Sequence, residues 1–357
     1  MWLGFAVTLG CSSYGSGTGA AGAPSSFGGA SATGSEGGAS GGGSPSVGVA
    51  GAYAGHGLTE GKQSMIWIWQ NYRADVTLVA AHAASFTHVS PAFYQMNYAY
   101  TSGPLKYENA NDHYDGTSSA DLTTQIHAAG LKVVPLVYAG AGNNGTDDGI
   151  HNVLNDSPPG TQQNLISAMI NEANLKGYDG YNLDWEVSGD DTHYSEYGTK
   201  MIAFLGTFKK ALNAQGMQLS YDLGAWFVRQ CADDGVIDLA QMGDAVDLMV
   251  MEDYEKVLGN PGTACPTPAP TQLNCYSDFT AQLQVMCNMP VKNVSIGVIA
   301  PDTSAFASQA FSAASSYGFT GVALWPGNGA FLAQDNFPAG QSWFSVFSDF
   351  LASNAAK

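Results

Sequence analysis

Short apolar runs recur through residues 58–357, and most are separated by stretches in which apolar residues repeat with the period of a helix. Runs of apolar, β-branched and aromatic residues predict buried strands, and the helical period predicts amphipathic helices between them. The predicted strands are Met65–Trp69, Thr87–Tyr98, Lys132–Tyr138, Gly180–Glu186, Gln218–Leu223, Ala245–Met251, Val294–Ile299 and Gly321–Trp325. The predicted helices are Val76–Ala84, Ala120–Ala129, Gln162–Asn174, Tyr197–Ala214, Leu239–Met242, Asp278–Cys287, Ser304–Tyr317 and Gln341–Leu351.

Strands that alternate with helices, and that read as nearly continuous apolar runs, are typical of a parallel sheet covered by helices. With this number of repeats, the pattern predicts an α/β protein with a (β/α)8 barrel, the TIM barrel. An open doubly wound sheet is the alternative, but no strand is followed by a Gly-x-Gly-x-x-Gly turn. In a barrel, functional side chains are expected at the carboxyl ends of the strands.

The composition changes before the first predicted strand. Between Ser12 and Ala54, Gly, Ser and Ala fill 33 of 43 positions, and Glu36 is the only charged residue. Such a segment has too little apolar surface to fold. We therefore expect a signal-like or lipoprotein-like segment over residues 1–11, a disordered linker over 12–57, and a single barrel domain over 58–357.

The first ten residues are apolar and lead to Cys11. Ten residues are too few to cross a bilayer and are typical of the end of a secretory signal. The run Thr8-Leu9-Gly10-Cys11 resembles a bacterial lipoprotein signal, in which Cys11 would carry a lipid, although Thr8 and the missing basic start depart from that pattern. The alternative is an ordinary signal peptide or a start codon assigned too late. We expect an extracellular or cell-surface protein whose only membrane contact would be a lipid at Cys11.

The remaining cysteines agree with export. Cys231, Cys265, Cys275 and Cys287 are an even number in one third of the chain, which predicts two disulfides with three alternative pairings. Zinc binding is the competing use, but the sequence has no Cys-x-x-Cys pair. The histidines show no His-x-His or His-Glu-x-x-His spacing either. No metal or cofactor is therefore expected.

Acidic residues outnumber basic residues 30 to 12, for a net charge of -18, and charged residues are only 12% of the chain. Nucleic acid and anionic lipid would be repelled, because the sequence contains no basic cluster to reverse this charge. A neutral, hydroxyl-rich ligand remains compatible with the composition, and we expect a monomer.

Polar and apolar residues alternate along the predicted fourth strand. One face carries Asn182, Asp184 and Glu186, and the other carries Tyr181, Leu183 and Trp185. Because the apolar face would pack against helices, the polar face is expected to point into the barrel. A hydrogen-bonded ladder of polar groups is the simpler explanation, but it does not explain acids where burial penalises charge.

The two acids indicate a particular chemistry. Asp184 and Glu186 would lie about 6.6 Å apart along the strand, close enough for their side chains to share a proton. A protonated Glu is the general acid that a glycosidic oxygen needs. Two acids on one strand approach a sugar from the same side, so Asp184 is badly placed to attack from the opposite face. This points to a nucleophile in the substrate, such as the 2-acetamido group of N-acetylglucosamine.

The segment resembles the signature of glycoside hydrolase family 18, the chitinases and endo-β-N-acetylglucosaminidases. The family pattern is Asp-Gly-x-Asp-x-Asp-x-Glu. This sequence matches the pattern at Asp179, Gly180, Asp184 and Glu186, and it departs from the pattern at Asn182, where the family has Asp. The resemblance implies that Glu186 is the proton donor and that Asp184 orients the acetamido group. An Asp at the place of Asn182 can take a proton from Asp184, whereas Asn can only hydrogen-bond, so we expect retained activity with an altered pH profile.

Two further segments extend the resemblance. The family ends its sixth strand with Met-x-Tyr-Asp, whose Tyr bonds the acetamido carbonyl. Here Met251-Glu252-Asp253-Tyr254-Glu255 has one added residue, and the resemblance assigns that role to Tyr254. The family closes its eighth strand with a Trp under the sugar, which Trp325 matches. A Trp on a barrel strand could instead be core, but the predicted strand end favours a binding surface.

The third strand's usual Ser-x-Gly-Gly is replaced by Tyr138-Ala139-Gly140-Ala141-Gly142, a weak match. Five aromatic residues near predicted strand ends could widen a cleft or simply pack: Trp67, Trp69, Tyr94, Tyr98 and Trp226. The residues predicted to be catalytic are Glu186, Asp184 and Tyr254, and those predicted to bind substrate are Asp179, Asn182, Trp325, Glu255 and Tyr98.

The resemblance implies an exported hydrolase that cleaves the β-1,4 bond after N-acetylglucosamine, with retention, through an oxazolinium intermediate. The partner would be a polysaccharide or glycan that contains N-acetylglucosamine: chitin is the first expectation and the chitobiose core of N-glycans the second. A lectin is the alternative class, because some family 18 barrels have lost activity. That loss usually strikes the proton donor, and Glu186 is present.

Overall fold

A computed structural model of the chain describes a barrel within the compact unit Ala50–Lys357. The described residues are 61–69, 72–96, 100–104, 106–107, 119–140, 148–186, 197–224, 228–229, 232–233, 237–252, 280–281, 284–285, 287–300, 304, 307–332 and 337–353. No helix among them is both long and apolar enough to cross a membrane.

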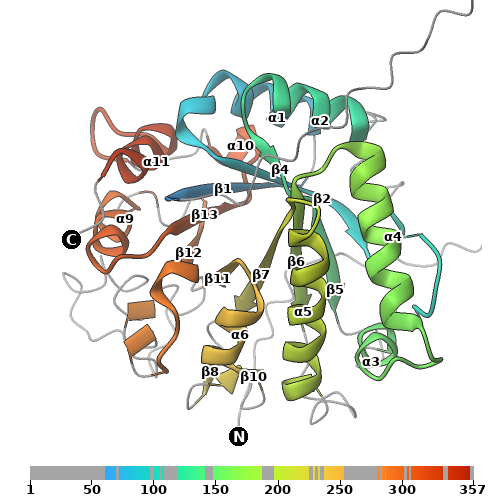
Figure 1. Cartoon of the computed structure of the whole chain (residues 1–357). Coiled ribbons are helices and arrows are strands. Elements are labelled where there is room, and N and C mark those ends of the chain that lie inside the picture. Colours follow the sequence, from blue (N-terminus) through green and yellow to red (C-terminus); the bar gives the residue numbers. More distant parts are fainter. Residues whose placement is uncertain are drawn as a thin grey trace, which may run out of the picture. The chain divides into compact units, whose positions relative to one another are not determined.

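Eight parallel strands form the barrel (Figure 1). They are β1 Gln63–Ile68, β2 His88–Gln95, β5 Leu136–Gly140, β6 Gly180–Glu186, β7 Gln218–Gly224, β11 Leu248–Glu252, β12 Val294–Ile299 and β13 Gly321–Trp325. Their order is β1-β13-β12-β11-β7-β6-β5-β2, and β1 also pairs with β2 in parallel, which closes the barrel. The predicted TIM barrel is therefore confirmed.

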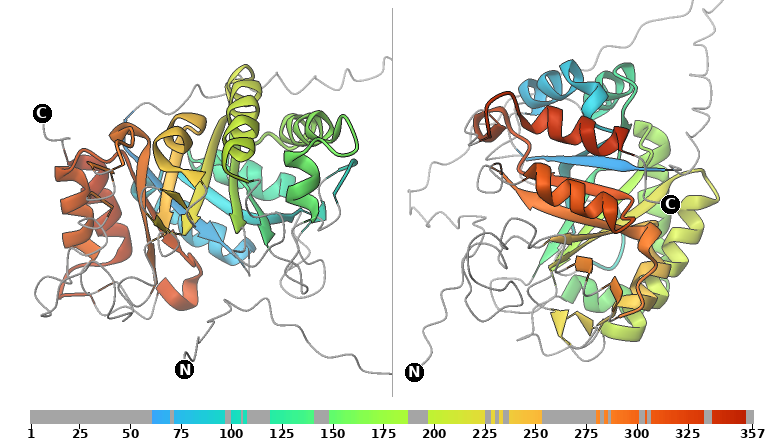
Figure 2. Two further views of the ribbon diagram at one scale, coloured as in Figure 1. Left: turned by 90° about the horizontal axis from the view of Figure 1, so that it is seen from below. Right: turned by 90° about the vertical axis from the view of Figure 1, so that its left-hand side faces the viewer.

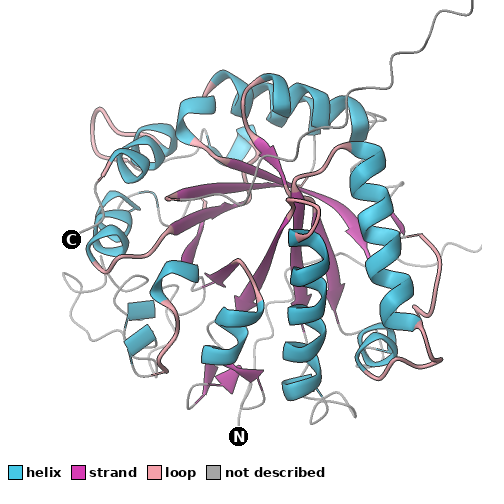
Figure 3. Cartoon of the chain, viewed as in Figure 1, coloured by secondary structure: helices cyan, strands magenta, loops and turns pink. Residues whose placement is uncertain are grey.

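Helices lie outside the strands (Figures 2 and 3). The α-helices are α1 Tyr72–Ala81, α2 Ser119–Ala128, α3 Asp148–Leu154, α4 Thr161–Lys176, α5 Tyr197–Asn213, α6 Leu239–Ala245, α9 Ala307–Ser316, α10 Gly329–Leu332 and α11 Trp343–Ala352. Single 3-10 turns form η1 Ala83–Ser85 and η5 Val291–Asn293. Three short strands after β7 form a separate antiparallel sheet: β8 Val228–Arg229, β9 Ala232–Asp233 and β10 Ile237–Asp238.

Several elements differ from the sequence prediction. The predicted strand Lys132–Tyr138 is divided into β4 Lys132–Val133 and β5, because Pro135 has no N–H to continue the ladder. β3 Lys106–Tyr107 pairs antiparallel with the end of β2 and was not predicted. The two short helices α3 and α10 were also not predicted, and the region of the predicted helix Asp278–Cys287 is described only in part.

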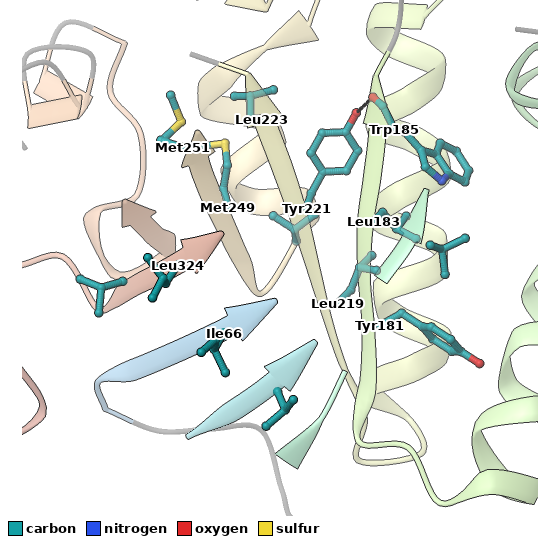
Figure 4. Packing of buried hydrophobic residues seen from close by; sticks show 14 of the residues in the cluster. Ile66, Tyr181, Leu183, Trp185, Leu219, Tyr221, Leu223, Met249, Met251 and Leu324 are labelled. Carbon is teal, nitrogen blue, oxygen red and sulfur yellow. Dashed lines mark hydrogen bonds between the residues drawn. The ribbon is translucent and has the colours of Figure 1, made fainter. Parts of the chain in front are cut away.

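The buried apolar residues form two separate cores. The outer core lies between strands and helices, and Figure 4 shows ten of its residues by name: Ile66, Tyr181, Leu183, Trp185, Leu219, Tyr221, Leu223, Met249, Met251 and Leu324. A smaller core fills the barrel interior: Met65, Trp67, Ala92, Val134, Leu136, Leu248, Val250 and Ala323. Since the apolar face of β6 belongs to the outer core, its polar face belongs to the interior, as predicted.

Gly180 allows β6 to lie close against β7. Its φ is +152°, and a Cβ built on it would lie 2.0 Å from the carbonyl oxygen of Gln218. A side chain there would therefore collide with the backbone of the neighbouring strand. This close approach fixes the height at which the inward-facing residues of β6 and β7 meet.

Candidate active site

The inward face of β6 carries Asn182 and then Asp184, and the backbone of Glu186 ends the strand. Asn182 is fully buried and Asp184 is half-buried, so the row rises from the closed interior toward the open end. Glu186 closes β6 in register with Gly140 of β5. The structure thus places the backbone of the two predicted catalytic acids where a TIM barrel carries its site.

Asn182 forms a network across the barrel interior. Its Oδ1 accepts a 2.7 Å hydrogen bond from Nε1 of Trp67 on β1 and a 3.3 Å bond from Oγ of Ser90 on β2. Its Nδ2 donates to Oγ of Ser220 at 3.0 Å and to Oδ1 of Asp222 at 2.8 Å, both on β7. All five side chains are buried. Asn182 therefore ties three strands to β6 directly below Asp184.

The register of the neighbouring strands brings further side chains to the same level. Tyr138 of β5 pairs with Asp184 and packs, half-buried, against the inner core. Asn182 pairs with Ser220, so the same register carries Asp184 to the position opposite Asp222. On the next strand, Met251 belongs to the outer core, which leaves the half-buried Glu252 on the inner face.

Sequence reasoning did not assign a role to Asp222 or Glu252. For Asp222 a signal was present, because Gln218, Ser220 and Asp222 alternate with apolar residues in the same way as the polar face of β6 does. Without the pairing of β6 and β7, that signal could not be connected to Asn182. Glu252 was read only as part of the run Met251–Glu255, which has one residue more than the Met-x-Tyr-Asp motif, and not as an inward-facing acid.

Two aromatic rings stand at the ends of neighbouring strands. Trp325 at the end of β13 and Trp69 just beyond β1 are both half-buried, pack against the inner core, and have ring centroids 5.9 Å apart. The structure therefore brings Trp325 to the end of the barrel that carries Asp184. By contrast, Trp67 is 1% exposed beneath them, and Tyr94 is buried in the outer core with its hydroxyl group bonded to Tyr178.

Asp179 is not brought together with the other predicted site residues. It precedes β6, seven residues before Glu186, which corresponds to about 23 Å along an extended strand. Its Oδ2 accepts a 2.8 Å bond from the Val133 backbone N–H and lies 2.9 Å from Nε2 of His127. These contacts tie α2 and β4 to the amino end of β6.

A buried histidine lies at the amino end of the interior. His88 of β2 is 1% exposed, and its Nδ1 lies 2.7 Å from Oγ1 of Thr87. Burial, assisted by the charge of Lys132, lowers the pKa of His88 to about 4, while Asp179 and a hydrogen bond with Gln218 oppose the shift. His88 is therefore neutral at pH 7 and closes the interior below Asn182.

Several predicted residues lie outside the described residues: Tyr254, Glu255, Tyr98, Trp226, Cys11, Cys231, Cys265 and Cys275. Cys287 is described and is 6% exposed. The roles of Tyr254 and its neighbour, the cysteine pairing and the lipid at Cys11 therefore stay predictions. Within the described part of the chain, no group of three or more His, Cys, Asp or Glu side chains could hold a metal ion.

Solved structures share this architecture. The Group IV chitinase of Ostrinia furnacalis superimposes with a TM-score of 0.62 at 13% identity, over 82% of this chain and 100% of its own. The chitinase of Chromobacterium violaceum gives 0.59 at 15% identity, over 82% and 100%. The spore cortex-lytic enzyme SleL of Bacillus cereus gives 0.58 at 13% identity, over 83% and 76%.

No protein-family model and no curated protein matches the sequence. Because the sequence identities are only 13–15%, these solved structures establish the fold alone. The fold that the family 18 resemblance implied is confirmed, because its structural neighbours are chitinases and SleL.

Proposed function

We propose that the protein is a glycoside hydrolase that cleaves the β-1,4 bond following N-acetylglucosamine, with the substrate's own acetamido group as nucleophile. The observation that carries the proposal is the position of Asp184 and Glu186, two residues apart at the carboxyl end of β6 inside a barrel. The chitinases among the solved structures support the same substrate class.

In the first step, the carboxylic acid of Glu186 donates its proton to the glycosidic oxygen. The acetamido carbonyl oxygen forms a bond to the anomeric carbon as the bond to the leaving sugar breaks. Asp184 accepts a hydrogen bond from the acetamido N–H and stabilises the positive charge of the resulting oxazolinium ring. The leaving sugar departs with the proton that Glu186 supplied.

In the second step, the carboxylate of Glu186 removes a proton from water as the water oxygen attacks the anomeric carbon. The oxazolinium ring opens, the acetamido group is restored, and Glu186 is again protonated. Each of the two displacement steps inverts the configuration at the anomeric carbon, so the product retains the configuration of the substrate. Trp325 would stack beneath the sugar and keep water from that face.

Both assigned acids come from one strand, and this distinguishes the mechanism from one with two opposed carboxylates. In the latter case, a second acid would have to face Glu186 across the sugar ring. Asp222 of β7 and Glu252 of β11 line the neighbouring strands on the same side of the interior. The arrangement therefore favours a nucleophile carried by the substrate.

The test is product analysis on chitohexaose and on a high-mannose glycopeptide, with wild-type protein beside Glu186→Gln. We expect wild type to cleave one of the two with retained anomeric configuration, and Glu186→Gln to lose about 10³-fold or more in rate. Activity that survives Glu186→Gln, or an inverted product, would overturn the mechanism.

The same experiment separates the lectin alternative. A lectin would bind chitohexaose or the glycopeptide and return it intact in both proteins. Retained binding without any product in the wild type would replace the hydrolase proposal with that of a binding protein.

A further inference from the structure

The orientation of the Asn182 amide is fixed by its partners. The indole Nε1 of Trp67 can only donate, so the atom 2.7 Å away must be the acceptor Oδ1. The Nδ2 group consequently faces β7, where Oδ1 of Asp222 accepts from it at 2.8 Å. Asp222 is 4% exposed, so this is a buried charge-compatible hydrogen bond rather than a surface contact.

The residues at positions 182 and 222 are matched to each other. An Asp at 182 would place a second acceptor against Oδ1 of Asp222, at a separation where two carboxylates cannot both ionise in a dry interior. An Asn at both positions would remove the carboxylate that accepts from Nδ2 of Asn182. The amide of Asn182 and the carboxylate of Asp222 are therefore complementary as donor and acceptor.

Asp222 also lies next to the predicted acetamido-orienting acid. The register that pairs Asn182 with Ser220 carries Asp184 to the position opposite Asp222, about 5 Å away across neighbouring strands. Within β6, positions 182 and 184 are about 6.6 Å apart. Along the backbone, position 222 is therefore at least as close to position 184 as position 182 is.

The surrounding charges increase the effect of this carboxylate. The adjacent strands β5, β6, β7 and β11 contain no Lys, Arg or His, whereas β6 and β11 contribute the half-buried acids Asp184 and Glu252. Among the described residues of these strands, Tyr138 of β5 is a further titratable group that packs against the inner core. With no basic side chain on these strands, each ionised acid favours protonation of its neighbours.

We propose that Asp222 is a positioning residue of the active site, in which it supplies from β7 the carboxylate that the family 18 pattern carries at the position of Asn182. This inference rests on the proposed function and identifies a further residue of the same site. Through Asn182 and Asp184, Asp222 holds the orienting acid in place and keeps the site's proton on Asp184 and Glu186.

The test is an exchange of the two side chains. The variants are Asp222→Asn, Asn182→Asp, and the double variant with both changes, which restores one carboxylate and one amide with their positions reversed. Each is measured on the substrate that wild type cleaves, with kcat and KM recorded as a function of pH. Circular dichroism and thermal unfolding show which variants are folded.

We expect Asp222→Asn to lower kcat about 100-fold with little change in KM, and to move the alkaline limb of the kcat profile to lower pH. The limb is expected to move because Asp222→Asn removes a negative charge near Glu186, so that Glu186 loses its proton at lower pH. The double variant is expected to recover at least tenfold in kcat over Asp222→Asn and to move the limb back. Asn182→Asp alone crowds two acids and is expected to lower kcat.

The inference is overturned if Asp222→Asn is folded and its pH profile and kcat match wild type. It is also overturned if the double variant is folded but no more active than Asp222→Asn. If Asp222→Asn does not fold, Asp222→Glu is tested in its place. Because this variant keeps the carboxylate, the alkaline limb of its kcat profile must stay at the wild-type pH, and a shifted limb would overturn the inference. Absence of hydrolysis by the wild type would count against the proposed function itself, which distinguishes the two failures.

Discussion

Trp69 and Trp325 stand at the carboxyl ends of the first and last barrel strands, with ring centroids 5.9 Å apart and ring planes inclined at 38°. Because β1 pairs directly with β13, this contact joins the two ends of the barrel domain at the level of the candidate site. Both rings are half-buried, so each keeps part of its surface available. A pyranose stacked on Trp325 would therefore rest on a ring that Trp69 supports.

Trp325→Ala is expected to raise KM for chitohexaose about tenfold or more, because the sugar loses its stacking surface, while the protein remains folded. Steady-state kinetics with thermal unfolding checks this. Trp343→Phe is the control: Trp343 is buried on α11 against Phe337, so its change should lower stability and leave KM unaltered. An unchanged KM in folded Trp325→Ala would remove Trp325 from the binding surface.

Gly180→Ala is expected to lower the free energy of unfolding by about 3 kcal/mol or more, because the new Cβ would collide with the Gln218 carbonyl oxygen. The matched control is Gly206→Ala in the middle of α5, where a Cβ meets no atom within 4 Å. That change should raise stability by about 1 kcal/mol. Urea unfolding of both variants beside wild type measures the difference. Equal stability of Gly180→Ala and wild type would show that β6 and β7 do not approach this closely.

The buried imidazole of His88 predicts a loss of stability in acid. Burial lowers the pKa of His88 from its ordinary value of 6.5 to about 4, so between these values the unfolded chain binds a proton that the folded protein does not. The stability that comes from keeping His88 neutral is therefore fully present above about pH 6.5, and it is lost as the pH falls toward 4. Between pH 7.5 and pH 5 it amounts to about 2 kcal/mol.

The measurement is urea unfolding at pH 7.5 and pH 5 for wild type and His88→Gln, in which the side chain stays neutral. We expect the difference between the two pH values to shrink by about 2 kcal/mol in the variant. His82→Gln is the control, because His82 is exposed to water. If His88→Gln keeps the full wild-type difference, another group is responsible for the acid sensitivity.

The barrel could be predicted from the sequence because its strands carry their own signal. Tyr181, Leu183 and Trp185 alternate with three polar residues, and that period alone places the polar row inside once helices are assigned to the other face. Strand ends were less predictable: one strand is divided at Pro135, and β2 ends at Gln95, which pairs with both β3 and β5. The alternation of polar and apolar residues does not show where these strands end.

The candidate site could be predicted only in part, because part of it is made by contacts between distant residues. Asp184 and Glu186 could be proposed as site residues from one strand alone. The bond from Trp67 to Asn182 joins residues 115 positions apart, and the one from Asn182 to Asp222 depends on a register that no single segment determines. Asp179 shows the converse limit of a motif: its bonds to His127 and Val133 lie at the amino end of β6, and the motif alone does not give that position.

The pairing of β1 with β13 also has a consequence during biosynthesis. Gln63 of β1 lies in register with Gly321 of β13. Because β1 is synthesised long before β13, the barrel can close only after β13 has been made. Until β13 is made, the ring of strands around Asn182 and Asp184 stays open between β1 and β12. A chain that ends before residue 321 should therefore lack the activity proposed above.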